Sequence, residues 1–550
     1  MKKAGILLLL FVCSLVSFSQ SEKEEKDQIA TLCKVWGFLK YYHPKVASGK
    51  LDWDQEFIVR VHEVKLLGTK EATSQFYCDW IKKLGFVAKC LECKKIEETD
   101  IKVNFDLSWI SDTSHFTKSL VEQLEYIRDN RNQGTNYYVD QIPQVGNTTY
   151  KNEKTYNDSI YPSSQMRLLT LARYWNIINY FYPYKYKTDE NWNDVLVEMI
   201  PKVESAADVT AYHLSLLELT TKVNDSHASL VTHDINKYFG LKWAPFKFRI
   251  IDKKVIVTGF LNEEFCKKND IRIGDVFLNV EGKDIADIIK EKEKYIGGSN
   301  PPTILRNYSF AIFNGSTDSV STTFERDNVV AQKTVYRYLP NELHFKKESS
   351  KMEDVFKILE GNIGYVDMGL LTVDQVKTVM AELADTKAII FDVRNYPNGT
   401  YGKLGQYLCK EPKPFAKFTT PDLEYPGLFL PVSGFKWGEE NRRYYKGKVI
   451  LLMDETTQSH AEFTLMAMRT LPDVVSIGSQ TAGADGNVSY IPLPGGIKTI
   501  MTGIGVYYPD GTETQRIGIV PDIEVKPTIA GIKAGKDEVL EKAIEVAQKK

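Results

Sequence analysis

Long hydrophobic runs are scarce in this sequence of 550 residues. An apolar stretch over residues 4–16 is too short to cross a bilayer of roughly 30 Å, and no later segment approaches the ~20 apolar residues that a spanning helix needs. We therefore expect no integral membrane span. Lys2 and Lys3 come before this stretch, and small residues and a polar SEKEEKDQ segment follow it. This order predicts a cleaved signal peptide over residues 1–20 and a secreted or periplasmic protein.

A strong charge of one sign is also missing. The net charge is -2 and the sequence has no basic run, which argues against nucleic acid as a main partner. The sequence contains no HExxH string, no Walker-type glycine loop and no dense cluster of His, Asp and Glu. We therefore expect neither a metal nor a cofactor.

Cysteine is rare, with seven residues in the whole chain. Cys90 and Cys93 have the spacing of a zinc knuckle, but no second pair lies nearby. The spacing therefore favours a local disulfide or two free thiols over a metal site, and export would allow oxidation.

An internal repeat marks the first half of the chain. The strings KVWGFLKYYHP and LDWDQEF match RYWNIINYFYP and ENWNDVL. The same 139 residues separate Trp36 from Trp175 and Trp53 from Trp192. One helical unit therefore occurs twice. Aromatic residues at helical spacing before a proline favour a place in the core over a ligand platform.

The sequence pattern changes twice after the repeat. Residues 239–345 contain short β-type runs such as FKFRIID and KKVIVTGF, with turns at Gly274 and Gly282. This hairpin-rich unit resembles a PDZ domain, which binds extended peptide by strand addition, and another small β-rich domain is the alternative. From residue 346 onward apolar strands alternate with helices, which is typical of an α/β unit with a parallel sheet.

Two loops follow buried strands of the α/β unit, at the sheet edge where active sites of such folds lie. The loop DVRNYPNG follows KAIIF, and the loop TTQSHAE follows KVILLMDE, contains Ser459 and opens a helix from Ala461. The hydroxyl of such a serine lies near free backbone N–H groups and the positive end of a helix dipole, which favour an oxyanion. A serine at a helix start is otherwise most often a simple N-cap.

These loops resemble those of the C-terminal-processing (tail-specific) serine protease family. FDVRNYPNG is similar to its DLRxNxGG signature, MDETTQSHAEF with VVSIGSQTAGADG to its nucleophile segment SAxE…IGExTxG, and RIGIVPDIEV to its closing GIxPDI motif. The resemblance covers about residues 200–526. It implies that Ser459 is the nucleophile and that Gly399 and the backbone N–H of His460 form the oxyanion hole, in a core of the ClpP/crotonase type.

The expected base differs from that of the better-known branch of this family, which uses a lysine 25 residues after the serine. Ala484 stands there in this chain, so a seryl hydroxyl needs another proton acceptor. The tricorn-core-like branch uses a histidine ahead of the PDZ region, and NDSHA places His227 there. The resemblance makes Ser226 and a late glutamate the residues that orient this histidine. Glu513 is the candidate for that glutamate, and position Gln515 is the alternative.

The predicted fold class is multidomain α+β, with a helical N-terminal region, a PDZ-like β domain and an α/β protease core. The expected divisions are a signal peptide (1–20), a helical N-terminal domain (21–128), a linker (129–163), a helical segment of the protease with the second repeat copy (164–238), the PDZ-like domain (239–345), the protease core (346–530) and a C-terminal helix (531–550).

The expected function is that of an exported serine endopeptidase that cleaves peptides or unfolded protein tails through an acyl-enzyme. A catalytically inactive, PDZ-containing peptide-binding protein of the same fold is the alternative, favoured by the missing lysine and by Asn398 in place of the first glycine of the usual pair. A glycan-binding or other export-linked module is a weaker alternative. The sequence leaves the oligomeric state open.

Overall fold

The computed structural model describes residues 23–343 and 352–549, so the expected signal peptide over residues 1–20 lies outside the described residues. The chain divides into two compact units. The first runs to Val223 and also contains residues 419–431 and 488–504, and the second contains residues 224–418, 432–487 and 505–550. Among the described helices, none is both long enough and apolar enough to cross a membrane. The expected mixed α+β, multidomain architecture is confirmed.

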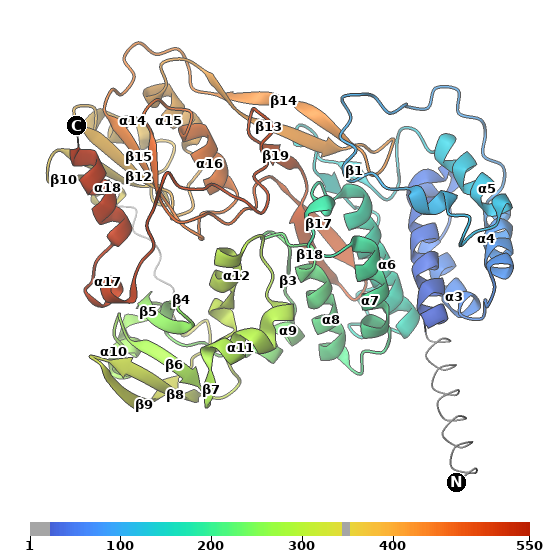
Figure 1. Cartoon of the computed structure of the whole chain (residues 1–550), viewed down its shortest axis with the longest axis horizontal. Helices are drawn as coiled ribbons and strands as arrows, with labels where there is room; N and C mark the ends of the chain where they lie inside the picture. Colours follow the sequence, from blue (N-terminus) through green and yellow to red (C-terminus); the bar gives the residue numbers. More distant parts are fainter. Residues whose placement is uncertain (1–22, 344–351, 550) are drawn as a thin grey trace, which may run out of the picture. The chain divides into compact units, whose positions relative to one another are not determined.

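The first unit is mainly helical (Figure 1). A helix over residues 23–42 opens it. The further elements are α2 (Pro44–Ala47), α3 (Trp53–Val64), α4 (Lys70–Leu84), η1 (Ser108–Ser111), α5 (Lys118–Asp129), β1 (Asp140–Gln141), β2 (Thr148–Thr149), α6 (Ser164–Phe181), η2 (Lys185–Lys187), α7 (Trp192–Glu204), α8 (Val209–Thr221), β17 (Val488–Leu493) and β18 (Ile497–Thr502). A disulfide joins Cys90 and Cys93.

The repeated tryptophans form two equivalent pairs. The indole of Trp36 donates to the carbonyl of Trp53 at 2.8 Å, and the indole of Trp53 donates back at 3.0 Å. Trp175 and Trp192 make the same reciprocal bonds at 2.6 and 3.0 Å. All four side chains are buried, so the predicted core role of the repeated aromatic residues is confirmed.

The second unit begins with an antiparallel sheet in the order β4-β5-β6-β8-β9, in which β4 and β9 are the edge strands. The apolar strands FKFRII and KVIVTGF form β4 and β5, as their β-type composition predicts. The elements before this β module are β3 (Ser229–Leu230) and α9 (His233–Phe239). The β module contains β4 (Phe246–Ile251), β5 (Lys254–Phe260), α10 (Glu263–Lys268), β6 (Val276–Val280), β7 (Lys283–Asp284), α11 (Ile285–Lys292), η3 (Glu293–Tyr295), α12 (Pro301–Asn307), η4 (Tyr308–Phe310), β8 (Ser319–Arg326) and β9 (Val329–Tyr336).

The α/β core of the second unit is built on a six-stranded sheet in the order β10-β11-β12-β15-β16-β20. All neighbours pair in parallel except β10 and β11. Its elements are α13 (Met352–Val355), β10 (Phe356–Leu359), β11 (Ile363–Asp367), α14 (Val376–Glu382), β12 (Ala388–Asp392), α15 (Tyr401–Leu408), β15 (Lys448–Met453), α16 (His460–Met468), β16 (Val475–Gly478) and β20 (Ile523–Glu524). The strands not yet named are β13 (Lys413–Pro421), β14 (Phe429–Trp437) and β19 (Gly505–Tyr507).

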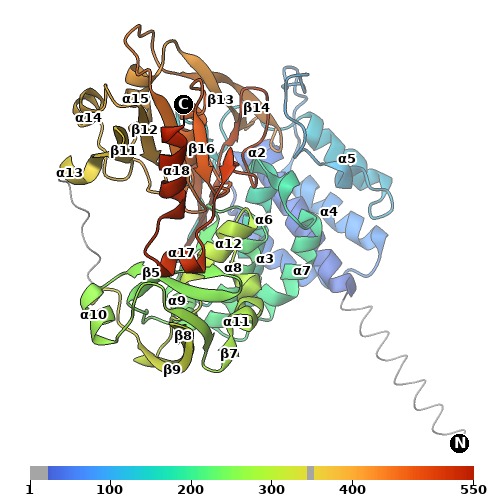
Figure 2. The same ribbon diagram turned by 60° about the vertical axis from the view of Figure 1, so that its left-hand side comes forward.

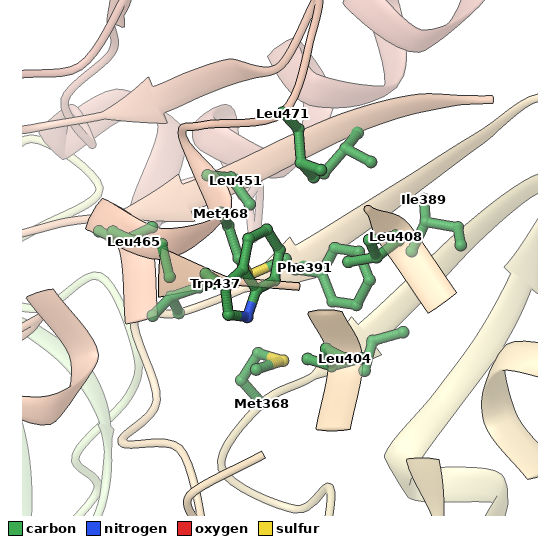
Figure 3. Close-up of a cluster of buried hydrophobic side chains, with 14 of the residues drawn as sticks. Met368, Ile389, Phe391, Leu404, Leu408, Trp437, Leu451, Leu465, Met468 and Leu471 are labelled. Atoms are coloured by element: carbon green, nitrogen blue, oxygen red, sulfur yellow. The ribbon is translucent and has the colours of Figure 1, made fainter. Parts of the chain in front are cut away.

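Helices cover both faces of this sheet, because its strands alternate their side chains between two apolar cores. Ile389 and Phe391 of β12 pack toward α15 and α16, in the cluster shown in Figure 3. Ile390 of the same strand packs on the opposite face with Val539 and Ala543 of α18 (Glu538–Gln548). Figure 2 shows α18 lying along this face, with α17 (Ile529–Lys533) between it and the β module.

Candidate active site

Ser459 stands at a strained turn between β15 and α16. Its φ of 58° and ψ of -124° are unusual for a residue with a side chain, a feature that clusters at functional sites. The preceding residues tie this turn to the loop after β12, since the hydroxyls of Thr456 and Thr457 donate to the carbonyls of Arg394 and Val393 at 2.9 and 3.1 Å. The two loops singled out in the sequence therefore lie together.

The buried carboxylate of Glu462 fixes the Ser459 turn. It accepts hydrogen bonds from the backbone N–H groups of Ser459 (3.1 Å), Gly483 (2.8 Å) and Ala484 (3.0 Å), and from the hydroxyl of Thr481 (2.5 Å). Complete burial raises the pKa of Glu462 above its ordinary value, while these hydrogen bonds act to lower it. Glu462 thus joins the nucleophile turn to the loop of Gly483 and Ala484, where the lysine of the better-known branch is absent.

His227 lies on a turn that is bonded to both of these segments. The amide of Gln458, the residue before Ser459, donates to the carbonyl of Ser226 at 3.1 Å. The hydroxyl of Ser226 donates to the carbonyl of Ala482 at 3.0 Å. These two bonds attach the turn that carries His227 to the residue before Ser459 and to the loop of Ala482.

The side chain of His227 is nearly buried, with 8% of it exposed. Burial lowers the pKa of its imidazole below the ordinary value, and the carboxylate of Asp225 acts against that shift. An imidazole with a lowered pKa is neutral at neutral pH, which is the form that can accept a proton.

Asp225 is the acidic group that the structure places beside this histidine. Its Oδ1 lies 3.9 Å from Nδ1 of His227, accepts the backbone N–H of His227 at 3.0 Å and accepts the amide of Gln515 at 3.3 Å. Asp225 is not among the predicted site residues. The string NDSHA nevertheless carries a signal for it, because an acid two residues before a histidine can fold back on it.

Ser226 and Glu513, the predicted orienting residues, lie in the following surroundings. The hydroxyl of Ser226 bonds Ala482 and accepts the backbone N–H of Ser299 at 2.8 Å. Glu513 is half-buried and pairs through its backbone with Tyr507. The side chain that reaches Asp225 from this region is that of Gln515, the alternative position.

The predicted oxyanion donors, Gly399 and the backbone N–H of His460, belong to the loop after β12 and to the start of α16. His460 is the first residue of α16, so its backbone N–H has no acceptor within the helix. Gly399 has a φ of 71°, and a Cβ atom built there would meet nothing within 4 Å. Asn398 before it donates to the carbonyls of Gly369 and Leu371 at 2.7 and 3.1 Å. Asn398 therefore holds the shape of the loop in which the usual first glycine is missing.

A comparison with known families and structures decides the class of this site. The sequence profile of peptidase family S41 matches residues 362–525, which include the candidate nucleophile and both loops. We call residues 362–525 the S41 domain because of this match. The S41 domain makes this protein a serine-type peptidase, whose substrates are peptides or proteins.

Solved structures extend the similarity beyond the S41 domain. Mature CPAF has a TM-score of 0.56 at 15% identity, over 70% of this chain and 97% of that chain. Mature CPAF complexed with lactacystin has a TM-score of 0.54 at 15% identity, over 70% of this chain and 98% of that chain. The photosystem II D1 C-terminal processing protease has a TM-score of 0.40 at 14% identity, over 68% of this chain and 98% of that chain. No curated protein sequence matches the chain.

Proposed function

We propose that the protein is an exported serine endopeptidase that cleaves peptide tails, with Ser459 as nucleophile and His227 as general base. The carrying observation is the pair of hydrogen bonds from Gln458 to Ser226 and from Ser226 to Ala482, which attach the histidine turn to the nucleophile turn. This arrangement replaces the missing lysine with an imidazole.

The reaction follows from these placements. The imidazole of His227 takes the hydroxyl proton of Ser459 while the seryl oxygen attacks the carbonyl carbon of the peptide bond. The N–H groups of His460 and Gly399 stabilise the resulting oxyanion. The imidazolium then gives its proton to the leaving amine, which leaves an acyl-enzyme. Water attacks the ester, His227 takes the proton of the water, and the seryl oxygen regains it.

Asp225 completes the proposed site as the group that orients His227. Its carboxylate favours the imidazolium that forms during both steps, because opposite charges this close attract strongly in a buried setting. We propose this role for Asp225 in addition to Ser226, which holds the turn, while Glu513 stays a prediction.

The β module is proposed to be a PDZ-like domain that holds the peptide tail. Its strand β4 is an edge strand of an antiparallel sheet, the arrangement to which an extended peptide can add. Arg249 of β4 bonds Asp454 and Glu455 in the loop that leads to Ser459, with a distance of 2.6 Å to Glu455. A tail on β4 would therefore lie near the nucleophile loop. Export rests on the signal-like first twenty residues.

A fluorophosphonate probe tests the catalytic proposal. We expect covalent labelling at Ser459 that Ser459→Ala abolishes and that His227→Ala slows by about 10³-fold or more. His233→Ala, at the first position of α9, is the matched control and should label at the wild-type rate. A folded wild-type protein that takes up no probe would leave the inactive peptide-binding protein as the better account.

A further inference from the structure

A partly exposed aromatic surface lies next to the candidate nucleophile. It consists of Tyr396, Tyr401, His460 and Phe463. The ring of His460 lies 6.1 Å from that of Tyr396 and 5.4 Å from that of Tyr401, between ring centroids. Tyr401 lies 5.3 Å from Phe463. The surface therefore runs without a break from the loop after β12, across the residue that follows Ser459, onto α16.

The core of the S41 domain supports this surface from behind. Phe463 contacts the fully buried Phe415 at a centroid distance of 4.8 Å, and both Tyr401 and Phe463 pack against the buried cluster of Figure 3. Rings held by a close-packed core keep a fixed shape, because such interiors resist displacement. Tyr396 is the outermost member, with 58% of its side chain exposed.

The surface is also uncharged at neutral pH. Burial lowers the pKa of His460, so its imidazole is neutral there. The two phenol rings and the phenyl ring add apolar faces whose preferred partners are other aromatic or large aliphatic groups. A charged side chain would lose its hydration on this surface and receive no opposite charge from these four rings.

The aromatic surface is adjacent in sequence to the proposed oxyanion hole, and this indicates which substrate residue contacts the surface. The scissile carbonyl oxygen would rest against the backbone N–H of His460. The Cα atom of the residue that supplies this carbonyl is one bond from the carbonyl carbon. Its side chain is therefore a substrate group that can reach the rings around His460.

We propose that this aromatic surface selects substrates with an aromatic or large aliphatic residue on the acyl side of the cleaved bond. The proposal rests on the proposed function, and it adds the substrate class. It makes Tyr396 a specificity-determining residue, because it is the exposed ring that a substrate side chain can cover.

A series of peptides that differ only at this residue tests the proposal. For the full-length mature protein, kcat/KM with Phe or Leu should exceed kcat/KM with Ala by about tenfold or more, and cleavage with Asp should be weakest. Tyr396→Ala should reduce the ratio of Phe to Ala by about fivefold. The matched control is Tyr490→Ala on β17, where 66% of the tyrosine is exposed, and it should keep the wild-type ratio.

Fluorophosphonate labelling separates the two ways of failing. If Ser459 of the wild-type protein labels but the peptides are cleaved at equal rates, the aromatic surface does not select substrates and the inference is overturned. If the preference appears on the amine side of the bond instead, the assigned position is overturned. If Ser459 does not label at all, the proposed function fails and the inference fails with it.

Discussion

Asp225 has a side chain with no solvent exposure and lies two residues before His227. A carboxylate near a buried imidazole affects proton transfer in two ways. It raises the pKa of the imidazole, here against the lowering effect of burial. It also stabilises the imidazolium that forms when the base has taken its proton. The two effects can be separated, since the first moves a pH profile and the second changes its height.

Asp225→Asn is therefore expected to lower kcat/KM at neutral pH by about 10²-fold or more and to move the acid limb of the pH profile. A general base works in its neutral form, so activity falls as pH drops through the pKa of His227. Removing the carboxylate lowers that pKa further, and the acid limb should move to lower pH. The measurement is kcat/KM against pH for a peptide substrate.

The control for this variant is Asp385→Asn, which changes an exposed carboxylate in the turn after α14. This variant should leave unchanged both the height and the acid limb of the profile of kcat/KM against pH. An Asp225→Asn protein with lower activity but an unmoved limb would mean that Asp225 only holds the fold of the turn.

The repeated helix pairs show how two tryptophans can join two helices. In each copy an indole donates to the carbonyl at the start of the partner helix, and the partner indole donates back. The bonds satisfy two buried indole donors and two backbone carbonyls at once, and the rings fill the space between the helices.

Trp192→Phe should therefore destabilise the protein by about 2–4 kcal/mol, since it removes ring volume and the buried hydrogen bond from the indole to the carbonyl of Trp175. Urea unfolding followed by circular dichroism should show a lower midpoint with an unchanged slope. Trp109→Phe, at a half-buried position in η1, serves as the comparison and should cost less. Equal losses in the two variants would mean that the reciprocal bonds add nothing.

Local sequence patterns predicted these elements well. The match between the tryptophan strings gave the duplicated helix pair, and the alternation of strands and helices after residue 346 gave the core sheet. The motif strings also selected the segments of Ser459 and His227, because family motifs keep a fixed order along the chain, and the catalytic roles of these two residues stay predictions. Periodicity could not show that Asp225 folds back on His227, because that contact depends on the shape of a turn.

Local sequence patterns also could not predict how the whole chain divides into two compact units. Residues 419–431 and 488–504 belong to the first compact unit although they lie far along the chain. Nothing in their composition links them to helices some 300 residues earlier. Their contacts are buried polar bonds, such as those from the hydroxyl of Tyr42 to the carbonyl of Pro426 at 2.5 Å and from Asn147 to the carbonyl of Val488 at 2.8 Å.

The first unit should consequently fail as a separate fragment of residues 23–223. Without the later segments, the guanidinium of Arg173 loses the carbonyl of Pro492, and the guanidinium of Arg131 loses the carbonyl of Glu424. Each of these hydrogen bonds contributes about 0.5–1.5 kcal/mol, so the loss of these two and of the bonds made by Tyr42 and Asn147 removes a large share of the total stability of a domain, about 5–15 kcal/mol. We expect the fragment to retain helical circular dichroism but to unfold without a cooperative transition.

Adding residues 488–504 back through a flexible linker should restore part of the transition, because the linked hairpin β17–β18 supplies the acceptors for Asn147 and Arg173. Thermal melts of the two fragments at equal concentration make the comparison. A fragment of residues 23–223 that melts as sharply as the linked form would show that the helical repeat is stable by itself. In that case residues 419–431 and 488–504 would bind to a unit that has already folded, and residues 23–223 would need no other part of the chain in order to fold.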